Sequence, residues 1–168
     1  PDYGHVYYNL GTAYIKLGMY KQAIERLKQA TNTNPDYAAV HYNLGIAYSK
    51  SGMHKEAIEA YKQAISIDHD YAAVHFNLAG TYCKLGMHKE AIEAYKQAIS
   101  IDHGYAKAHY NLGVVYGKLG MYKEAVEAYK KAIRIDPDHL EAHINLSTAY
   151  GGLGMFEVAK ETCKQAIR

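Results

Sequence analysis

The sequence predicts an all-α solenoid built from five helix-turn-helix repeats. The first observation is a period. The segment YNLGTAYIKLGMYKQAIE, which begins at Tyr8, returns 34 residues later as YNLGIAYSKSGMHKEAIE from Tyr42, and again as YNLGVVYGKLGMYKEAVE from Tyr110. The second observation is that apolar residues within each copy recur at the three-to-four-residue spacing of a helix. A period of this length is typical of stacked helix pairs.

Two further copies complete the series, FNLAGTYCKLGMHKEAIE from Phe76 and INLSTAYGGLGMFEVAKE from Ile144. We therefore expect a single array over residues 1–168, with repeats at 4–37, 38–71, 72–105, 106–139 and 140–168. Residues 1–3 have the sequence PDY, which also closes the first repeat, and we interpret them as the tail of a preceding repeat. Positions within a repeat are numbered below as places, with place 1 at the first residue of each range.

The first helix of each repeat is indicated by leucine at place 7 and tyrosine at place 11, which share one helical face because they are four apart. The leucines are Leu10, Leu44, Leu78, Leu112 and Leu146, and the tyrosines are Tyr14, Tyr48, Tyr82, Tyr116 and Tyr150. The second helix is indicated by alanines at places 20 and 27, two turns apart, with a large residue between them at place 24. These alanines are Ala23, Ala57, Ala91, Ala125 and Ala159, then Ala30, Ala64, Ala98, Ala132 and Ala166.

Glycine at place 15 separates the two helices in every repeat, since it suits the left-handed conformation that ends a helix. These glycines are Gly18, Gly52, Gly86, Gly120 and Gly154. At place 32, Pro35 and Pro137 stop the second helix. His69 and His103 replace that proline in the second and third repeats. We expect the second helix to be slightly longer in those two repeats.

Composition narrows the function classes. Hydrophobic residues make up 49% of the chain and the formal net charge is +2, with lysines interleaved with glutamates, so the sequence offers no dense basic block for nucleic acid. No apolar run approaches the roughly 20 residues that span a bilayer. Cys83 and Cys163 lie far apart and outside any CxxC pair. We expect a soluble, cytoplasmic protein without nucleic-acid or membrane partners.

Catalytic and metal-binding signals are absent from the sequence. It contains no nucleophile elbow, phosphate-binding glycine loop or HExxH motif. The histidines at place 4 recur one repeat apart, too far for neighbours to share a metal ion, and the pair His139 and His143 has no further ligand at a recognised spacing. We therefore predict that the chain is not an enzyme and needs neither a cofactor nor a metal.

The combination of NLG, Tyr, Gly, two Ala and Pro at these places resembles the tetratricopeptide repeat family over essentially the whole chain. The array is similar to the repeat region of O-linked N-acetylglucosamine transferases, and also to consensus-like bacterial or designed arrays. The resemblance implies a right-handed superhelix whose first helices line a concave groove that binds peptides or proteins. The chain departs from the family pattern at place 4, which is tyrosine or histidine, and at place 8, where Ala79 and Ser147 replace glycine.

In the family arrangement, three rows of side chains face the groove, and we predict that they bind a peptide. An asparagine at place 6 can donate to and accept from a peptide backbone, an aromatic residue at place 5 adds rigid contact area, and a lysine at place 13 favours an acidic or phosphorylated ligand. The alternative for each row is a purely structural role. The residues are Asn9, Asn43, Asn77, Asn111 and Asn145; Tyr8, Tyr42, Phe76 and Tyr110; and Lys16, Lys50, Lys84 and Lys118.

The leading hypothesis is a non-catalytic scaffold or adaptor that binds an extended peptide or protein segment in the groove. One alternative is self-assembly through uncapped ends of the stack. Another is that the array recruits substrates to a larger enzyme whose catalytic domain lies elsewhere. The sequence does not identify the partner.

Overall fold

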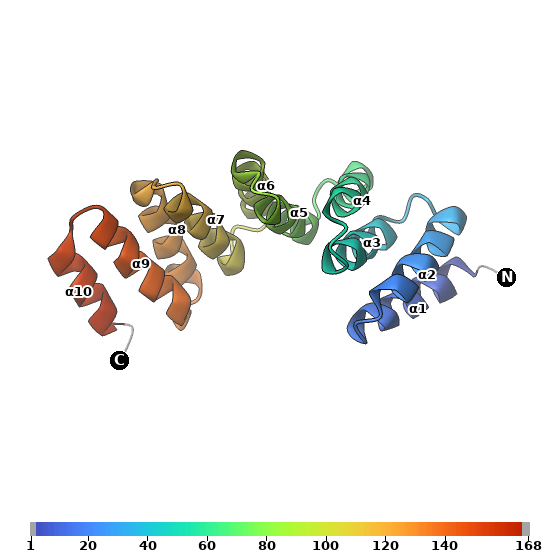
Figure 1. The fold of residues 1–168 in the computed structure, drawn as a ribbon, viewed down its shortest axis with the longest axis horizontal. Coiled ribbons are helices and arrows are strands. Elements are labelled where there is room, and N and C mark those ends of the chain that lie inside the picture. The colour runs from blue at the N-terminus through green and yellow to red at the C-terminus, as the bar shows by residue number, and fades with distance from the viewer. Residues whose placement is uncertain (1–2, 166–168) are drawn as a thin grey trace. The chain divides into compact units, whose positions relative to one another are not determined.

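The computed structural model describes residues 3–165, and within them it contains ten α-helices and no strands (Figure 1). The expectations for Pro1, Asp2 and Ala166 lie outside these residues. The first helices of the five repeats are α1 (Gly4–Lys16), α3 (Ala38–Lys50), α5 (Ala72–Lys84), α7 (Ala106–Lys118) and α9 (Leu140–Gly152). The second helices are α2 (Tyr20–Thr33), α4 (His54–Ile67), α6 (His88–Ile101), α8 (Tyr122–Ile135) and α10 (Phe156–Gln165).

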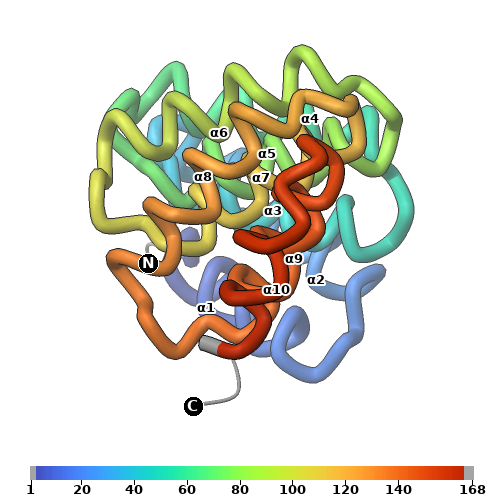
Figure 2. The backbone as a smooth tube through the Cα atoms, turned by 90° about the vertical axis from the view of Figure 1, so that its left-hand side faces the viewer, coloured from blue at the N-terminus to red at the C-terminus, as the bar shows by residue number. Residues whose placement is uncertain are grey.

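The chain divides into two compact units, Pro1–Met87 and His88–Arg168. In the first unit, α1 packs on α2 and α3 on α4, and each second helix also contacts the first helix of the next repeat. The second unit repeats this scheme, with α7 packed on α8 and α8 in contact with α9, as the backbone trace also shows (Figure 2). The predicted all-α solenoid of helix-turn-helix repeats is confirmed. That the five repeats form one domain stays a prediction.

Every turn between the two helices of a repeat has the same hydrogen bonds. In the first repeat, the Met19 amide donates to the Tyr14 carbonyl at 2.9 Å and the Gly18 amide donates to the Ile15 carbonyl at 3.0 Å. This pair of bonds is the Schellman motif, which requires a left-handed residue between the helix and the following chain. The five place-15 glycines all adopt it, with φ between 71° and 78°. The turn predicted from these glycines is therefore present.

The expectation of longer second helices in the second and third repeats is wrong. Helices α4 and α6 have 14 residues, the same length as α2 and α8. The reason is a local side-chain bond. The Asp68 carboxylate accepts the Asp70 amide at 3.1 Å, and the Asp102 carboxylate accepts the Gly104 amide at 2.9 Å. These aspartates form a turn that competes with continued helix, so proline is not needed.

The core is built from the close approach of the two helices within a repeat. The alanines at places 20 and 27 are buried where the structure describes them, apart from half-buried Ala159. At the place-8 glycines there is no room for a side chain opposite the large residue at place 24. A Cβ atom added to Gly45 would lie 2.5 Å from the Tyr61 ring, and one added to Gly113 would lie 2.6 Å from the Tyr129 ring.

The fifth repeat reverses this size relationship. Ser147 replaces the glycine at place 8, and Cys163 replaces the tyrosine at place 24. The Ser147 hydroxyl lies 2.9 Å from both the Ala159 carbonyl and the Cys163 sulfur. The smaller cysteine thus makes room for the larger residue opposite, which explains why this departure from the family pattern is tolerated.

The histidines at place 4 connect a first helix to the loop before it. In His41 and His143 the Nε2 atom lies 2.7 Å and 2.9 Å from the carbonyl oxygens of Pro35 and Pro137. A carbonyl only accepts, so Nε2 carries the proton. His75 makes the equivalent bond to His69 at 3.4 Å. These rings therefore connect neighbouring repeats.

Burial lowers the pKa of two of these histidines. For His75, loss of hydration lowers the pKa below the ordinary value of 6.5, against the opposing effect of the hydrogen bond to the His69 backbone. For His109, burial again has the largest effect, a hydrogen bond to the His103 backbone opposes it, and the positive charge of Lys131 adds to the lowering of the pKa. Burial therefore favours the neutral form of both rings in the folded chain.

We predict that Gly45→Ser destabilises the fold by about 1–3 kcal/mol through overpacking against Tyr61. The double variant G45S/Y61C, which copies the fifth repeat, should lose less than the sum of the two single variants. Gly151→Ala is the matched control. An added Cβ there meets nothing within 4 Å, so it should stabilise α9 by up to about 1 kcal/mol. Urea unfolding measures all four, and additive losses in the double variant would contradict the packing argument.

The histidine environment predicts a pH dependence of stability. Between the lowered folded pKa and the unfolded value of 6.5, the unfolded chain binds more protons than the folded chain. The contribution of these two histidines to the free energy of unfolding should therefore be fully present above about pH 6.5. The free energy of unfolding should fall as the pH drops below this value. In the H75Q/H109Q variant, glutamine keeps an N–H donor but does not titrate, so the slope should flatten. An unchanged slope in urea titrations at several pH values would disprove this origin.

Candidate functional site

The asparagine row lies on the first helices at place 6. Asn9, Asn43 and Asn77 belong to the first unit, and Asn111 and Asn145 to the second. Asn9 is exposed, Asn43 is buried, and the other three are half-buried. The burial of these asparagines therefore varies along the row, although the residue type is the same.

Three of these asparagines use an amide N–H to link neighbouring repeats. Nδ2 of Asn77 donates to the Tyr42 hydroxyl at 2.9 Å, and Nδ2 of Asn145 donates to the Tyr110 hydroxyl at 3.2 Å. In each case the acceptor is the place-5 tyrosine of the preceding repeat.

Asn43 departs slightly from this arrangement, because its Nδ2 donates to the Thr12 hydroxyl at 3.0 Å. No side-chain hydrogen bond of Asn111 is present among the described residues. The linked asparagines thus have the structural role that was the alternative interpretation, but each of their amides keeps a second N–H and its carbonyl oxygen.

Three of the aromatic residues at place 5 pack against the ring at place 34 of the same repeat. Tyr8 contacts Tyr37 with ring centroids 5.3 Å apart, and Tyr42 contacts Tyr71 at 5.0 Å. In the second unit, Tyr110 lies 4.5 Å from the ring of His139, a partner that sequence reasoning missed because place 34 is tyrosine in the first three repeats. Phe76 is half-buried in α5. The edges and hydroxyls of these rings are therefore positioned by the packing.

The lysine row is exposed at the ends of four first helices. Lys16, Lys50, Lys84 and Lys118 are the last residues of α1, α3, α5 and α7. A cation at this position interacts favourably with the helix dipole. The lysines therefore have a structural function whether or not they contact a ligand.

Between α3 and α5 the asparagine and lysine rows meet at a hollow of about 150 Å³. Its lining residues are Ile46, Ser49, Lys50, Tyr61, Asn77, Gly80, Thr81 and Lys84. A chain of polar contacts crosses it. The Lys84 ammonium donates to the Ser49 hydroxyl at 3.4 Å, Ser49 lies 3.4 Å from the Thr81 hydroxyl, and Thr81 donates to the backbone carbonyl of Asn77 at 2.9 Å.

Ser49 and Thr81 were not singled out from the sequence. Thr81 did carry a signal, because it is the polar residue at place 10, where the other repeats have alanine or valine. It is 1% exposed, and its hydroxyl is satisfied within the helix and toward Ser49. The polar Thr81, at a place that is apolar in the other repeats, was therefore the sequence signal specific to this hollow.

Other functional classes find no support in the described residues. No group of three or more His, Cys, Asp or Glu side chains there could hold a metal ion. His139 and His143 are engaged separately, with Tyr110 and with the Pro137 carbonyl. Within residues 3–165, none of the helices has both the length and the apolar character needed to cross a membrane.

Family models described as tetratricopeptide repeat match residues 38–71 and 106–139, residues 60–93, and residues 140–168. A model described as TPR repeat matches residues 11–52 and 80–120. Together these matches cover the chain from residue 11 onward. No curated protein sequence matches.

Several solved structures are similar to this one. A crystal structure of MamA protein has 29% sequence identity and a TM-score of 0.92, over 99% of this chain and 91% of that one. Another crystal structure of MamA has 30% identity and a TM-score of 0.89, over 94% and 92%. YrrB, described as a TPR protein with an unusual peptide-binding site, shares the fold at 22% identity and a TM-score of 0.82, over 96% and 83%. From its repeats, its turns and these matches, the chain belongs to the tetratricopeptide repeat family.

Proposed function

We propose that the chain is a protein-interaction scaffold that binds an extended peptide along its first helices, with an acidic or phosphorylated side chain at the hollow between α3 and α5. The observation that supports this most directly is the composition of that hollow. Two exposed lysines, Lys50 and Lys84, flank it, and its lining contains no carboxylate. A negatively charged side chain would complete the charge balance through charge-assisted hydrogen bonds.

The remaining hydrogen-bonding capacity of Asn77 suits a peptide backbone. One N–H is used by Tyr42. The other N–H and the carbonyl oxygen can together meet a peptide C=O and N–H. Adjacent packed helices lie roughly 10 Å apart and an extended chain advances about 3.3 Å per residue, so one asparagine would serve about three ligand residues.

Peptide binding is also compatible with what is known of similar structures. YrrB has a peptide-binding site of its own, described as unusual. The tetratricopeptide architecture supports the class of function, an interaction scaffold, and the groove residues of this chain supply the proposed chemistry.

The lysines are tested by measuring fluorescence anisotropy of labelled peptides selected from a synthetic array that varies Glu, phosphoserine and Gln. In the K50Q/K84Q variant, affinity for a selected acidic peptide should fall about tenfold or more, because two charge-assisted contacts are lost. The control K21Q/K55Q removes the same charge from exposed lysines on α2 and α4. Equal affinities in the two variants would contradict the proposal.

The asparagines are tested by comparing Asn111→Ala with Asn77→Ala. Asn77→Ala removes a link between repeats and should cost about 0.5–1.5 kcal/mol of stability, whereas Asn111→Ala should leave thermal unfolding nearly unchanged. Both should weaken peptide binding. If Asn111→Ala and Asn77→Ala bind the selected peptide as the unaltered chain does, the asparagines serve the fold alone.

A second candidate function is self-association through α1. Leu10 is 38% exposed, although the equivalent Leu44 is 8% exposed, and Val6 beside it is 57% exposed. This apolar strip corresponds to the surface that the preceding second helix covers in later repeats. For the isolated 168-residue chain, the occupant we propose is a second copy of the chain; in a longer protein a preceding repeat would occupy the same surface.

Light scattering over a range of concentrations tests self-association. The mass of the unaltered chain should rise with concentration, and V6E/L10E should remain monomeric because two charges replace the apolar contact. A monomer mass at every concentration would exclude this candidate without affecting the peptide-binding proposal.

A further inference from the structure

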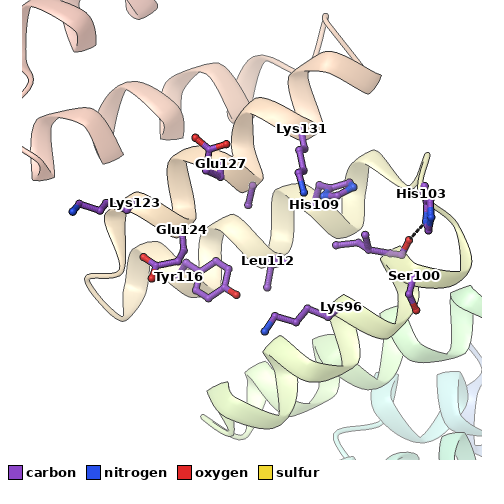
Figure 3. A pocket seen from close by; sticks show the side chains of 12 residues that line it. Lys96, Ser100, His103, His109, Leu112, Tyr116, Lys123, Glu124, Glu127 and Lys131 are labelled. Carbon is purple, nitrogen blue, oxygen red and sulfur yellow. Dashed lines mark hydrogen bonds between the residues drawn. The ribbon is translucent and has the colours of Figure 1, made fainter.

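A larger hollow lies in the second unit, on the side formed by α6, α7 and α8 (Figure 3). Its volume is about 550 Å³. Leu112 and Tyr116 from α7 and Ala128 from α8 supply apolar surface, and these three side chains are 9% exposed or less. None of the place-5, place-6 or place-13 residues lines it. This hollow is therefore separate from the peptide site proposed above.

A second hollow of about 400 Å³ adjoins the first, since the two share Ile99, His103, His109 and Lys131. It adds Arg134 and Ile135 from the last turn of α8. No carboxylate lines this second hollow. Glu124 and Glu127 line only the first, and Figure 3 shows Glu124 near Tyr116 while Lys131 lies near His109. Lys96 and Lys123 also line the first hollow, so that end carries charges of both signs beside its apolar surface, whereas the other end is basic.

The basic end arises from departures from the repeat. Place 26 is glutamine in the other four repeats and lysine at Lys131, and place 29 is asparagine or serine in the first three repeats and arginine at Arg134. Place 33 is aspartate in three repeats and glycine at Gly104. All three departures shift the local charge toward positive. The repeat fold does not require them, because the second repeat has uncharged residues at places 26 and 29 and aspartate at place 33.

The two cations are available to a ligand. Elsewhere in this unit lysines pair with glutamates one helical turn away, as Lys130 does with Glu127 at 3.7 Å. Within residues 3–165, neither Lys131 nor Arg134 forms an ion pair with a carboxylate. His103 points Nδ1 at the Ile99 carbonyl at 2.7 Å, and His109 is hydrogen-bonded to the His103 backbone. The positive charge of this end therefore comes from Lys131 and Arg134.

We propose that this surface is a second binding site, for a partner-protein segment in which an apolar side chain is followed by Glu or Asp residues. The apolar side chain occupies the hollow above Leu112, and the carboxylates pair with Lys131 and Arg134. A nucleic acid or an anionic membrane fits less well. The four cations that line the two hollows, Lys96, Lys123, Lys131 and Arg134, neutralise few phosphates, and Glu124 and Glu127 would repel a continuous polyanion.

The probes are two fluorescein-labelled synthetic peptides that contain the same leucine followed by three Glu or three Gln residues. In K131Q/R134S, both positions carry the residues that the second repeat has at the same places. The Glu peptide should bind the unaltered chain at least about tenfold more tightly than the Gln peptide, and K131Q/R134S should lose that preference. K21Q/K55Q, with the same net charge at exposed lysines outside both proposed sites, should retain it. Thermal unfolding verifies that these variants and K50Q/K84Q are folded.

Nuclear magnetic resonance locates the site. Addition of the Glu peptide should shift the amide signals of residues 99–104 and 131–135. Retained preference in K131Q/R134S, or shifts confined to α3 and α5, would overturn this proposal. If K50Q/K84Q alone loses the preference, the acidic peptide binds the groove between α3 and α5, which leaves the proposed function standing and this inference wrong. Loss of the preference in K131Q/R134S alone supports this inference, and the proposed function is decided separately by the array-selected peptides and K50Q/K84Q.

Discussion

The contact between glycine at place 8 and a large side chain at place 24 sets the distance between the two helices in the repeats that have this glycine. Where the ring of Tyr61 lies against the backbone at Gly45, no side chain fits between them. The same ring contacts Tyr42, with centroids 6.3 Å apart. The hydroxyl of Tyr42 then meets Asn77 of the next repeat. The core contact therefore positions Tyr42 and, through it, the asparagine of the next repeat. In the second unit, Tyr129 contacts Tyr110, and the Tyr110 hydroxyl accepts from Asn145 in the same way.

The two proposed sites differ in how the repeat produces them. The groove residues are periodic, so their functional and structural roles coincide: Lys84 ends a helix, and Asn77 joins two repeats. The surface between α6 and α8 is instead defined by exceptions, with Lys131 and Arg134 at places where earlier repeats have uncharged residues. Because the periodic residues already hold the fold together, such exceptions are free to serve recognition. A scaffold of this design can add a binding site by changing a few exposed residues.

Much of the fold was predictable because its causes are local and repeated. The period, the apolar spacing and the place-15 glycines depend on interactions within one repeat. The helix ends at Asp68 and Asp102 were not predicted, because a side-chain turn replaced the expected proline. The candidate site was predicted less well. Whether Asn43 is buried and Asn9 exposed depends on the neighbouring repeat, and the sequence pattern is identical at both places.

The division between contacts within a repeat and contacts across repeats affects how such an array can change its length. The partners at places 8 and 24 belong to one repeat, so a repeat can be copied or deleted as a unit with its core pairing intact. The link from a place-6 asparagine to a place-5 hydroxyl joins two neighbouring repeats. This link is lost whenever the preceding repeat has phenylalanine at place 5. An added repeat therefore leaves the pairing of helices within each repeat unchanged. At each new junction, however, the residue at place 5 determines whether the next asparagine keeps its full hydrogen-bonding capacity for a ligand.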